Sequence, residues 1–212
     1  MPQSSSTPIQ VLVIDYGVGN HGSVVNALKR LGIRYAVSAR TEDIEKAPAY
    51  ILPGVGAFAE AMHNLKRLGI IDVLREQVIE KKKPILGICL GMQILADDSS
   101  ENGQHAGLGF IPGHVVRIEN SKDIRVPHVG WNDLKIQKKD PLFLRLDKRM
   151  RFYFDHSYQF KTDATYVAAT CEYGEMLTAA VQHKNIFGAQ FHPEKSQVSG
   201  LRLLRAFFNY AV

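Results

Sequence analysis

The chain has 212 residues, of which 45% are hydrophobic and 22% are charged, as expected for a globular protein with one sizeable core. The formal net charge is +5, but no basic patch is interleaved with aromatic residues, which argues against a nucleic-acid partner. No apolar run approaches the roughly 18 residues of a membrane span, and the sequence MPQSSSTPIQ is not expected to be a signal peptide, because it has no positive region and no apolar core. We therefore expect one domain over residues 1–212 in the cytoplasm, with residues 1–8 as a disordered tail and no membrane partner.

The number of cysteines and the spacing of cysteines and histidines limit which disulfide or metal sites the chain can form. Cys89 and Cys171 are too few for a disulfide framework, so both thiols are expected to be free. No C-x-x-C or H-E-x-x-H spacing occurs, so we expect neither a metal site nor a cofactor.

The first half of the chain alternates between strand and helix patterns. Short apolar runs ending at Gly or Pro predict buried strands, and apolar positions at helical spacing predict amphipathic helices between them. The predicted elements are a strand at Val11–Asp15, a helix at Ser23–Leu31, strands at Tyr35–Ser38 and Ala49–Leu52, helices near Ala57–Leu68 and Ile71–Lys82, a strand at Pro84–Cys89 and a helix at Met92–Ala96. This order is typical of βαβ units.

The second half is dominated by closely spaced strand patterns. The predicted strands are Val115–Glu119, Trp131–Gln137, Arg151–Phe160, Tyr166–Glu172, Leu177–His183 and Ile186–Phe191, before a final helix at Gln197–Ala211. The predicted fold class is α/β, with a mostly parallel central sheet flanked by helices and additional antiparallel strands in the second half.

The run Gly87-Ile88-Cys89-Leu90-Gly91 follows a predicted strand and precedes a predicted helix. A nucleophile between two glycines at such a turn stands above the sheet edge, where the helix N-terminus favours the thiolate and the Leu90 amide can stabilise an oxyanion. The pattern also fits a cysteine that is only a small buried hydrophobic residue. Cys171 has no such setting and is predicted to be structural.

A thiol nucleophile needs a base, and His192 in Phe191-His192-Pro193-Glu194 is the best candidate. Proline favours an extended chain here, and residues two apart in an extended chain share a face, so Glu194 can orient the imidazole. The alternative is a turn histidine beside a surface glutamate. The cysteine turn and the His-Pro-Glu segment together favour a catalytic triad.

Six motifs spread over the chain resemble those of triad-type (class I) glutamine amidotransferases, and in particular of the glutaminase subunits of imidazole glycerol phosphate synthase. They are IDYGVGN at Ile14–Asn20, PGVGAF at Pro53–Phe58, LGICLGMQ at Leu86–Gln93, RVPHVGWN at Arg125–Asn132, FDHSY at Phe154–Tyr158 and FHPEKS at Phe191–Ser196. The resemblance implies that Cys89 attacks the side-chain amide of glutamine, that His192 protonates the departing ammonia, and that water hydrolyses the resulting glutamyl thioester.

The resemblance also implies the remaining site residues. The oxyanion donors would be the backbone amides of Leu90 and Val55. The residues implied to hold glutamine are Gly56, Gln93, Glu101, His156, Ser157 and Tyr158. Ammonia would pass to a (β/α)8-barrel cyclase partner, which would form a heterodimer with this chain for histidine biosynthesis. The residues implied to face that partner are Asn20, Arg125, His128, Trp131, Tyr153 and Lys195.

Three alternatives stay open on the sequence. A paralogous glutaminase could supply ammonia to a sugar amidotransferase in surface-polysaccharide synthesis. A stand-alone cysteine hydrolase would cleave peptides or esters without a partner. A noncatalytic binding module is disfavoured because Cys89, His192 and Glu194 are all present.

Overall fold

The structure is a computed structural model that describes residues 8–19, 21–120, 124–144 and 150–211. Asn20 and most of the predicted tail lie outside these ranges. Within the described residues, the main sheet has eight strands in the order β2-β1-β3-β4-β14-β13-β12-β9. Their bounds are β1 (Val11–Ile14), β2 (Tyr35–Ser38), β3 (Tyr50–Gly54), β4 (Ile85–Cys89), β9 (Lys135–Ile136), β12 (Val167–Tyr173), β13 (Glu175–His183) and β14 (Ile186–Ala189).

The five strands from β2 to β14 are parallel, and β14, β13, β12 and β9 pair antiparallel, so the predicted mixture of a parallel sheet with later antiparallel strands is confirmed. Every residue of the four parallel strands β1, β3, β4 and β14 is buried, whereas the edge strand β2 is partly exposed. All four residues of β1 are buried, as its unbroken apolar sequence VLVI predicts.

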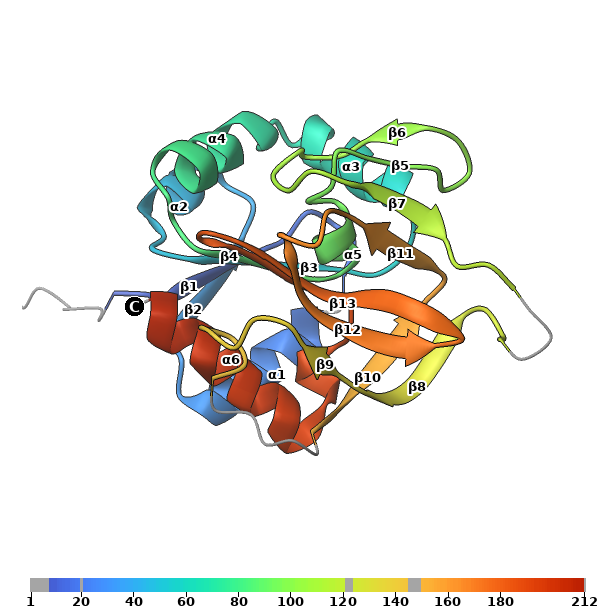
Figure 1. Cartoon of the computed structure of the whole chain (residues 1–212). Coiled ribbons are helices and arrows are strands. Elements are labelled where there is room, and N and C mark those ends of the chain that lie inside the picture. Colours follow the sequence, from blue (N-terminus) through green and yellow to red (C-terminus); the bar gives the residue numbers. More distant parts are fainter. Residues whose placement is uncertain (1–7, 20, 121–123, 145–149, 212) are drawn as a thin grey trace, which may run out of the picture.

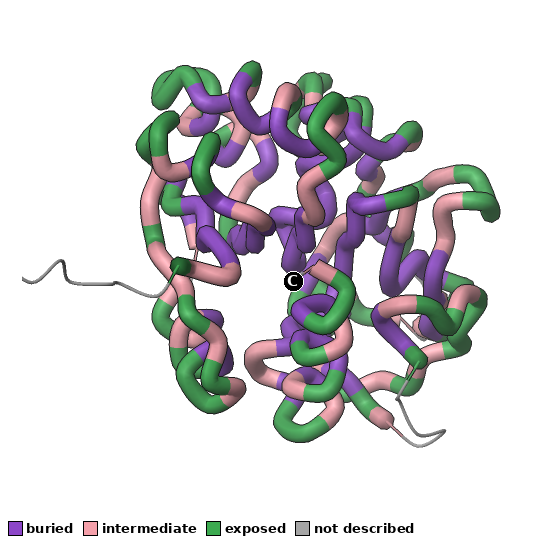
Figure 2. The backbone as a smooth tube through the Cα atoms, turned by 90° about the vertical axis from the view of Figure 1, so that its left-hand side faces the viewer, coloured by how far each residue is buried: buried purple, intermediate pink, exposed green. Residues whose placement is uncertain are grey.

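Helices cover both faces of the sheet and enclose two hydrophobic cores. Figure 1 shows α1 (His21–Leu31) and α6 (Gln197–Ala211) on one side and α2 (Thr41–Lys46), α3 (Phe58–Arg67) and α4 (Ile71–Arg75) on the other. Successive side chains of a strand point to opposite faces, so Val11 and Val13 pack with α1 and α6, whereas Leu12 and Ile14 pack with the other three helices. Figure 2 shows the buried residues concentrated between the layers.

Two smaller sheets, one antiparallel and one mixed, extend this core. A ribbon consists of β8 (His128–Asp133) and β10 (Arg151–His156). A four-stranded sheet has the order β11-β7-β5-β6, with β5 (Asp98–Ser99), β6 (His105–Ala106), β7 (His114–Arg117) and β11 (Tyr158–Lys161).

Four predicted elements differ from the structure. The predicted strand Trp131–Gln137 is divided between two sheets, as the second half of β8 and as β9. The predicted strand Arg151–Phe160 is two strands, because the chain leaves the ribbon after His156 and joins another sheet at Tyr158. The predicted helix Ile71–Lys82 is α4 followed by a π-helix at Glu76–Glu80, and the predicted helix Met92–Ala96 is the shorter, earlier α5 (Leu90–Gln93). Helix α2 is an addition: only Ile44 of its six residues is buried, so it has no apolar period.

The parallel register brings three chain segments to one edge of the sheet. Gly54 at the end of β3 pairs with Cys89 at the end of β4, and Ala189 at the end of β14 pairs with Ile88. The carboxyl ends of parallel strands are where α/β sheets bind ligands. The residues that follow these strands therefore meet around Cys89.

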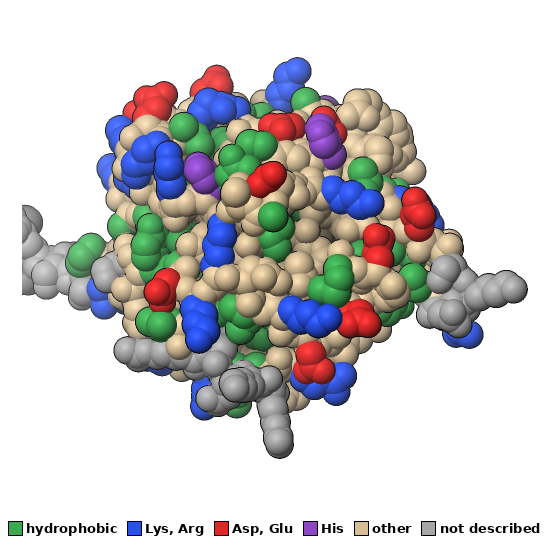
Figure 3. Space-filling view, viewed as in Figure 1, with side chains coloured by type: hydrophobic (Ala, Val, Ile, Leu, Met, Phe, Trp, Pro, Cys, Tyr) green, Lys and Arg blue, Asp and Glu red, His purple; other side chains and the backbone are tan. Residues whose placement is uncertain are grey.

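Two surface properties complete the description. On the face shown in Figure 3, basic and acidic side chains are interspersed over the surface. Among the described residues, no helix is long and apolar enough to cross a membrane.

Candidate active site

Cys89 lies at a strained turn between β4 and α5. Its φ of +53° and ψ of −110° form a combination that residues other than glycine rarely adopt. The turn is tight because two glycines allow close backbone contact. A Cβ on Gly91 would lie 1.7 Å from the Leu52 carbonyl oxygen, and one on Gly87 would lie 2.5 Å from the Gly91 carbonyl oxygen. The glycines around the cysteine are therefore required by the packing of α5 against β3 and β4.

The neighbouring imidazole comes from the chain after β14. His192 Nδ1 lies 2.7 Å from Glu194 Oε1, and each side chain is 3% exposed. The prediction of a fully extended His-Pro-Glu segment is wrong, because Pro193–Lys195 forms a 3-10 helix after an extended His192. Proline restricts the residue before it, yet its own φ suits the start of a helix. A turn of 3-10 helix thus brings the Glu194 carboxylate to the imidazole, and not the shared face of an extended strand.

The His192 ring is buried, but its surroundings favour the charged form. Burial lowers the pKa of His192, whereas hydrogen bonds to the Cys89 sulfur and to Glu194, with the negative charges of both groups, outweigh burial and raise that pKa well above its usual range. Since Nδ1 faces the carboxylate, the hydrogen bond to sulfur falls to Nε2. The sulfur, imidazole and carboxylate of the predicted triad therefore lie in contact in that order.

A cavity of about 500 Å³ is lined by Cys89 and His192. The residues predicted to hold glutamine or to form the oxyanion hole line the same cavity: Val55, Gly56, Leu90, Gln93, Glu101, His156, Ser157 and Tyr158. Four lining residues have no predicted role: Asn102 and Arg117 lie outside the six motifs, whereas Pro127 and Asp155 lie inside two of them. Lys195, which is predicted to face the partner, also lines the cavity. Asn102 could have been found from the sequence because it adjoins Glu101. Arg117 lies in a predicted strand, but its place opposite Tyr158 is set by the strand register, which only the structure gives.

The turn after β3 supplies the cavity wall next to Leu90. The buried Tyr16 hydroxyl donates a hydrogen bond to the Pro53 carbonyl oxygen at 2.6 Å and so fixes the end of β3. Gly56 has a φ of +103°, which favours glycine, and Val55 is 41% exposed. The predicted strand-to-helix turn is thus fixed at Pro53 by the bond from Tyr16, whereas Val55 beyond it is exposed to solvent.

Gln93 faces the cavity from α5, but its amide nitrogen bonds within the protein. Nε2 donates to the Tyr158 carbonyl oxygen at 3.1 Å and to Gln190 Oε1 at 3.0 Å. These two bonds use both amide hydrogens. Only Oε1 of Gln93 therefore remains for a ligand, as an acceptor.

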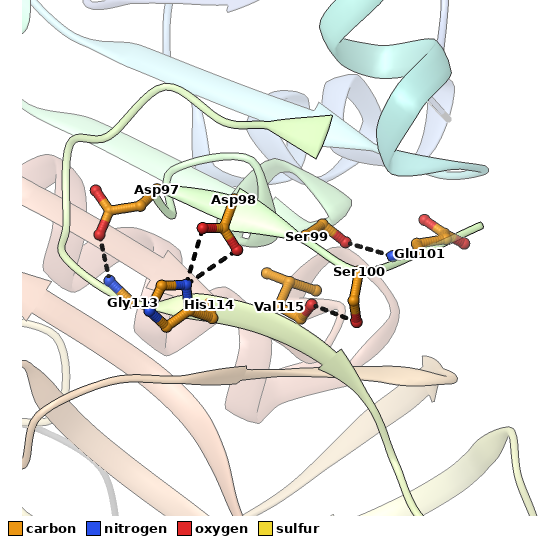
Figure 4. Close-up of polar contacts among 8 residues, drawn as sticks. All are labelled: Asp97, Asp98, Ser99, Ser100, Glu101, Gly113, His114 and Val115. Carbon is orange, nitrogen blue, oxygen red and sulfur yellow. Dashed lines mark hydrogen bonds and ion pairs between the residues drawn. The ribbon is translucent and has the colours of Figure 1, made fainter. Parts of the chain in front are cut away.

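Glu101 is held at the cavity rim by its neighbours in sequence and by α3. Its carboxylate Oε2 accepts the backbone N–H of Phe58, the first residue of α3, at 2.7 Å. Its own N–H donates to Ser99 Oγ at 3.1 Å (Figure 4). The same view shows two side-chain contacts between the segments of β5 and β7. The Asp98 carboxylate lies 2.9 Å from His114 Nδ1, and the Asp97 carboxylate accepts the backbone N–H of Gly113.

Known families and proteins identify the chain. The family model described as glutamine amidotransferase class-I matches residues 12–210. The chain belongs to this family. Imidazole glycerol phosphate synthase subunit HisH 1 from Campylobacter jejuni (strain 81-176) is 47% identical over 197 residues, which cover 93% of this chain and 98% of the relative. Subunit HisH 2 from Pseudomonas aeruginosa is 48% identical over 198 residues, with 93% and 98% covered. The resemblance inferred from the motifs is confirmed.

Solved structures of other amidotransferases share the fold. One described as glutamine amidotransferase superimposes with a TM-score of 0.74 at 25% identity, covering 94% of this chain and 98% of that one. The structure of PurLQS from Thermotoga maritima has a TM-score of 0.75 at 21% identity, covering 94% and 97%. Both agree with the predicted amidotransferase-like α/β class.

In this amidotransferase, the β8–β10 ribbon carries three of the six residues predicted to face a partner: His128, Trp131 and Tyr153. Trp131 is 39% exposed, and its neighbour Val129 is 53% exposed. The Trp131 ring meets Tyr153 edge-on with centroids 6.1 Å apart, and Lys195 Nζ lies 5.6 Å from the centroid of the Tyr153 ring. Since the Tyr153 ring is also 6.4 Å from that of His192, this surface adjoins the active site.

The prediction that His128 faces a partner is wrong. Its side chain is stacked between Phe154 and Tyr173, with centroids 4.6 and 4.0 Å away, and is buried. Its Nδ1 lies 3.0 Å from His156 Nε2, and His156 Nδ1 lies 2.8 Å from the Tyr158 carbonyl oxygen. Burial lowers the pKa of both histidines to about 4, so both rings are neutral at neutral pH.

The other predictions on the surface and the thiols have mixed outcomes. Arg125 is exposed in the loop before β8, and Asn20 lies outside the described residues. Cys89 and Cys171 are free and buried, and burial raises the pKa of Cys171 to about 12. No group of His, Cys, Asp and Glu in the described part of the chain could hold a metal ion.

Proposed function

We propose that this chain hydrolyses glutamine to glutamate and ammonia through Cys89, His192 and Glu194. The observation that carries the proposal is the buried contact of the imidazole with both the carboxylate and a sulfur held on a strained turn. Such an arrangement is that of an activated nucleophile with an oriented base.

The reaction follows from this contact. His192 takes the Cys89 proton, and the thiolate attacks the side-chain amide carbon of glutamine. The tetrahedral oxyanion is stabilised by the backbone amides of Leu90 and Val55. As the carbon–nitrogen bond breaks, His192 gives its proton to the leaving group, so ammonia departs and a γ-glutamyl thioester remains. Water, deprotonated by His192, then attacks the thioester, and glutamate leaves while the proton returns to sulfur.

The cavity wall would hold the amino-acid end of glutamine. Gln93 Oε1 and the Glu101 carboxylate are acceptors suited to the α-ammonium group. Backbone groups of Gly56 and of residues 156–158 complete the predicted binding set. A cavity of about 500 Å³ is large enough for one amino acid.

The ammonia would serve imidazole glycerol phosphate synthesis in histidine biosynthesis, as part of a heterodimer with a (β/α)8-barrel cyclase subunit. Relatives that cover nearly the whole chain and bear the name of this synthase support the assignment. Direct transfer is chemically reasonable, because ammonia released into neutral water is mostly protonated and is then not nucleophilic. Trp131, Tyr153, Arg125 and Lys195 would contact the cyclase.

The test is glutamate release from glutamine by the purified chain, alone and with a cyclase subunit that carries its nucleotide ligand. We expect strong activation in the mixture. The variant Cys89→Ala should lose at least about 10³-fold in kcat while keeping its fold and its affinity for the cyclase. Hydrolysis retained by the variant would overturn the mechanism, and equal activity with and without the cyclase would overturn the assigned partner.

A further inference from the structure

Gln190 is a buried residue next to the active site that belongs to no predicted catalytic set. It follows β14 by one residue, precedes His192 by two and is 0% exposed. Its backbone N–H donates to the Ala179 carbonyl oxygen at 2.9 Å, which fixes the chain. Its side-chain Nε2 lies 3.8 Å from Cys89 Sγ, within the distance of a hydrogen bond to sulfur.

The surrounding hydrogen bonds determine which end of the Gln190 amide faces the sulfur. The Tyr158 carbonyl oxygen can only accept, so the Gln93 atom 3.1 Å away must be the NH2 nitrogen. The same nitrogen lies 3.0 Å from the Gln190 amide and is a donor only, so the Gln190 atom there must be the oxygen. The NH2 group of Gln190 is therefore the end that faces Cys89.

This donor is balanced against an acceptor at the same sulfur. Cys89 Sγ also lies 3.8 Å from the Asp155 carbonyl oxygen, to which a neutral thiol can donate. A carbonyl dipole aimed at sulfur stabilises the thiol and disfavours the thiolate. The Gln190 N–H has the opposite effect, because a donor facing the sulfur stabilises the thiolate. This hydrogen bond does not require a proton from His192.

We propose that Gln190 is a positioning residue that donates a hydrogen bond to the Cys89 thiolate and keeps it available for attack. The inference rests on the proposed function, in which Cys89 is the nucleophile. In this arrangement Gln93 has a second role besides facing the ligand: its amide fixes that of Gln190. The buried amides thus connect the Tyr158 carbonyl group, at the cavity wall, to the sulfur.

The experiment measures the alkylation rate of Cys89 by iodoacetamide as a function of pH, read by mass spectrometry of the peptide that contains Cys89. Gln190→Met keeps the length of the side chain and removes the donor. Its rate curve should move to higher pH by about one unit, the equivalent of one hydrogen bond to a charged group. The kcat for glutamine at neutral pH should fall about 10-fold, with KM changed less than about 2-fold.

The matched control is Gln77→Met, which alters another glutamine that is 0% exposed. Gln77 lies in the π-helix away from the cavity, so this variant should leave the alkylation curve in place. If Gln190→Met does not fold, Gln190→Asn serves instead. Its side chain is one methylene shorter, which moves the N–H away from the sulfur, so the alkylation curve should again move to higher pH.

A folded Gln190→Met whose alkylation curve coincides with that of the wild type would overturn the inference, even if its activity fell at every pH. The outcome is separate from that of the proposed function, because alkylation requires no glutamine. A wild-type chain that releases no glutamate even with the cyclase subunit present would overturn the proposed function, whereas the alkylation curves would still test the hydrogen bond from Gln190.

Discussion

At the scale of single residues, the site depends on which protons each buried group can give or accept. Glu194 and the sulfur favour a charged His192, as both contacts raise its pKa. The pair His128 and His156 is different, because each ring must stay neutral. His156 donates from Nδ1 to the Tyr158 carbonyl group, so its Nε2 can only accept from His128. Protonation of His156 at Nε2 would therefore remove the acceptor of the hydrogen bond from His128.

The neutral pair predicts a dependence of stability on pH. The folded pKa of both histidines is about 4, below the value of 6.5 for an unperturbed imidazole. Between these values the unfolded state binds more protons, so the free energy of unfolding should fall as pH falls from 6.5 to 4 and level off below. Each ring contributes a slope of at most about 1.4 kcal/mol per pH unit.

Urea unfolding of the wild type and of His128→Phe at several pH values checks this expectation. Phenylalanine keeps the stacking between Phe154 and Tyr173 and removes one titrating group. The variant should therefore show a shallower dependence on pH between 6.5 and 4. Equal slopes for the two proteins would contradict the account of the histidine pair.

At the scale of elements, the turn from β4 to α5 depends on the close approach of β3. Leu52 in β3 contacts the position where Gly91 has no side chain, and Gly54 pairs with Cys89. The strain at Cys89 is typically about 1–3 kcal/mol and must be held by this packing. The position of the sulfur thus depends on β3 and β4 and not on α5 alone.

Gly91→Ala should destabilise the protein by about 3 kcal/mol or prevent folding, since overpacking against a rigid backbone is costly. Gly32→Ala is the matched control. Gly32 has a φ of +70°, but a Cβ there meets nothing within 4 Å, so its substitution should cost only about 1 kcal/mol. Denaturant unfolding measures both. Similar losses of stability for the two variants would mean that α5 does not need the contact with Leu52.

The sequence predicts the elements and residues that carry a local pattern. The strand at Val11–Ile14 and the helix at Gln197–Ala211 have unbroken or periodic apolar residues, and Cys89 is marked by its glycines. Features set by distant partners could not be predicted. The burial of His128 depends on two rings from other strands, and the contact of Gln190 with sulfur depends on the register of β14 against β4.

At the scale of the whole molecule, the site lies where the main sheet, the four-stranded sheet and the ribbon meet. The ribbon presents Trp131 and Val129 outward, and Tyr153 links that surface to His192. An exposed aromatic residue at the centre of such a patch is a typical anchor for a partner. This geometry allows a bound cyclase to lie next to the place where ammonia is released.

Trp131→Ala should weaken cyclase binding by about 30-fold, the effect of losing an aromatic anchor worth about 2 kcal/mol. Unstimulated hydrolysis should change little, because Trp131 does not line the cavity. The control is Val198→Ala on α6, which shortens an apolar side chain outside the ribbon that is more exposed than Trp131, 61% against 39%. Titration calorimetry with the cyclase measures both variants. Unchanged affinity for Trp131→Ala would exclude the ribbon as the main contact.

The central claim, that Cys89 forms a covalent intermediate with glutamine, is tested most directly by acid quenching during turnover. The quenched protein is digested and analysed by mass spectrometry. We predict that the peptide containing Cys89 gains the mass of one glutamyl group, and that Cys89→Ala shows no such gain at any peptide. Glutamate released with the glutamyl group on another residue, or by the Cys89→Ala variant, would contradict the account.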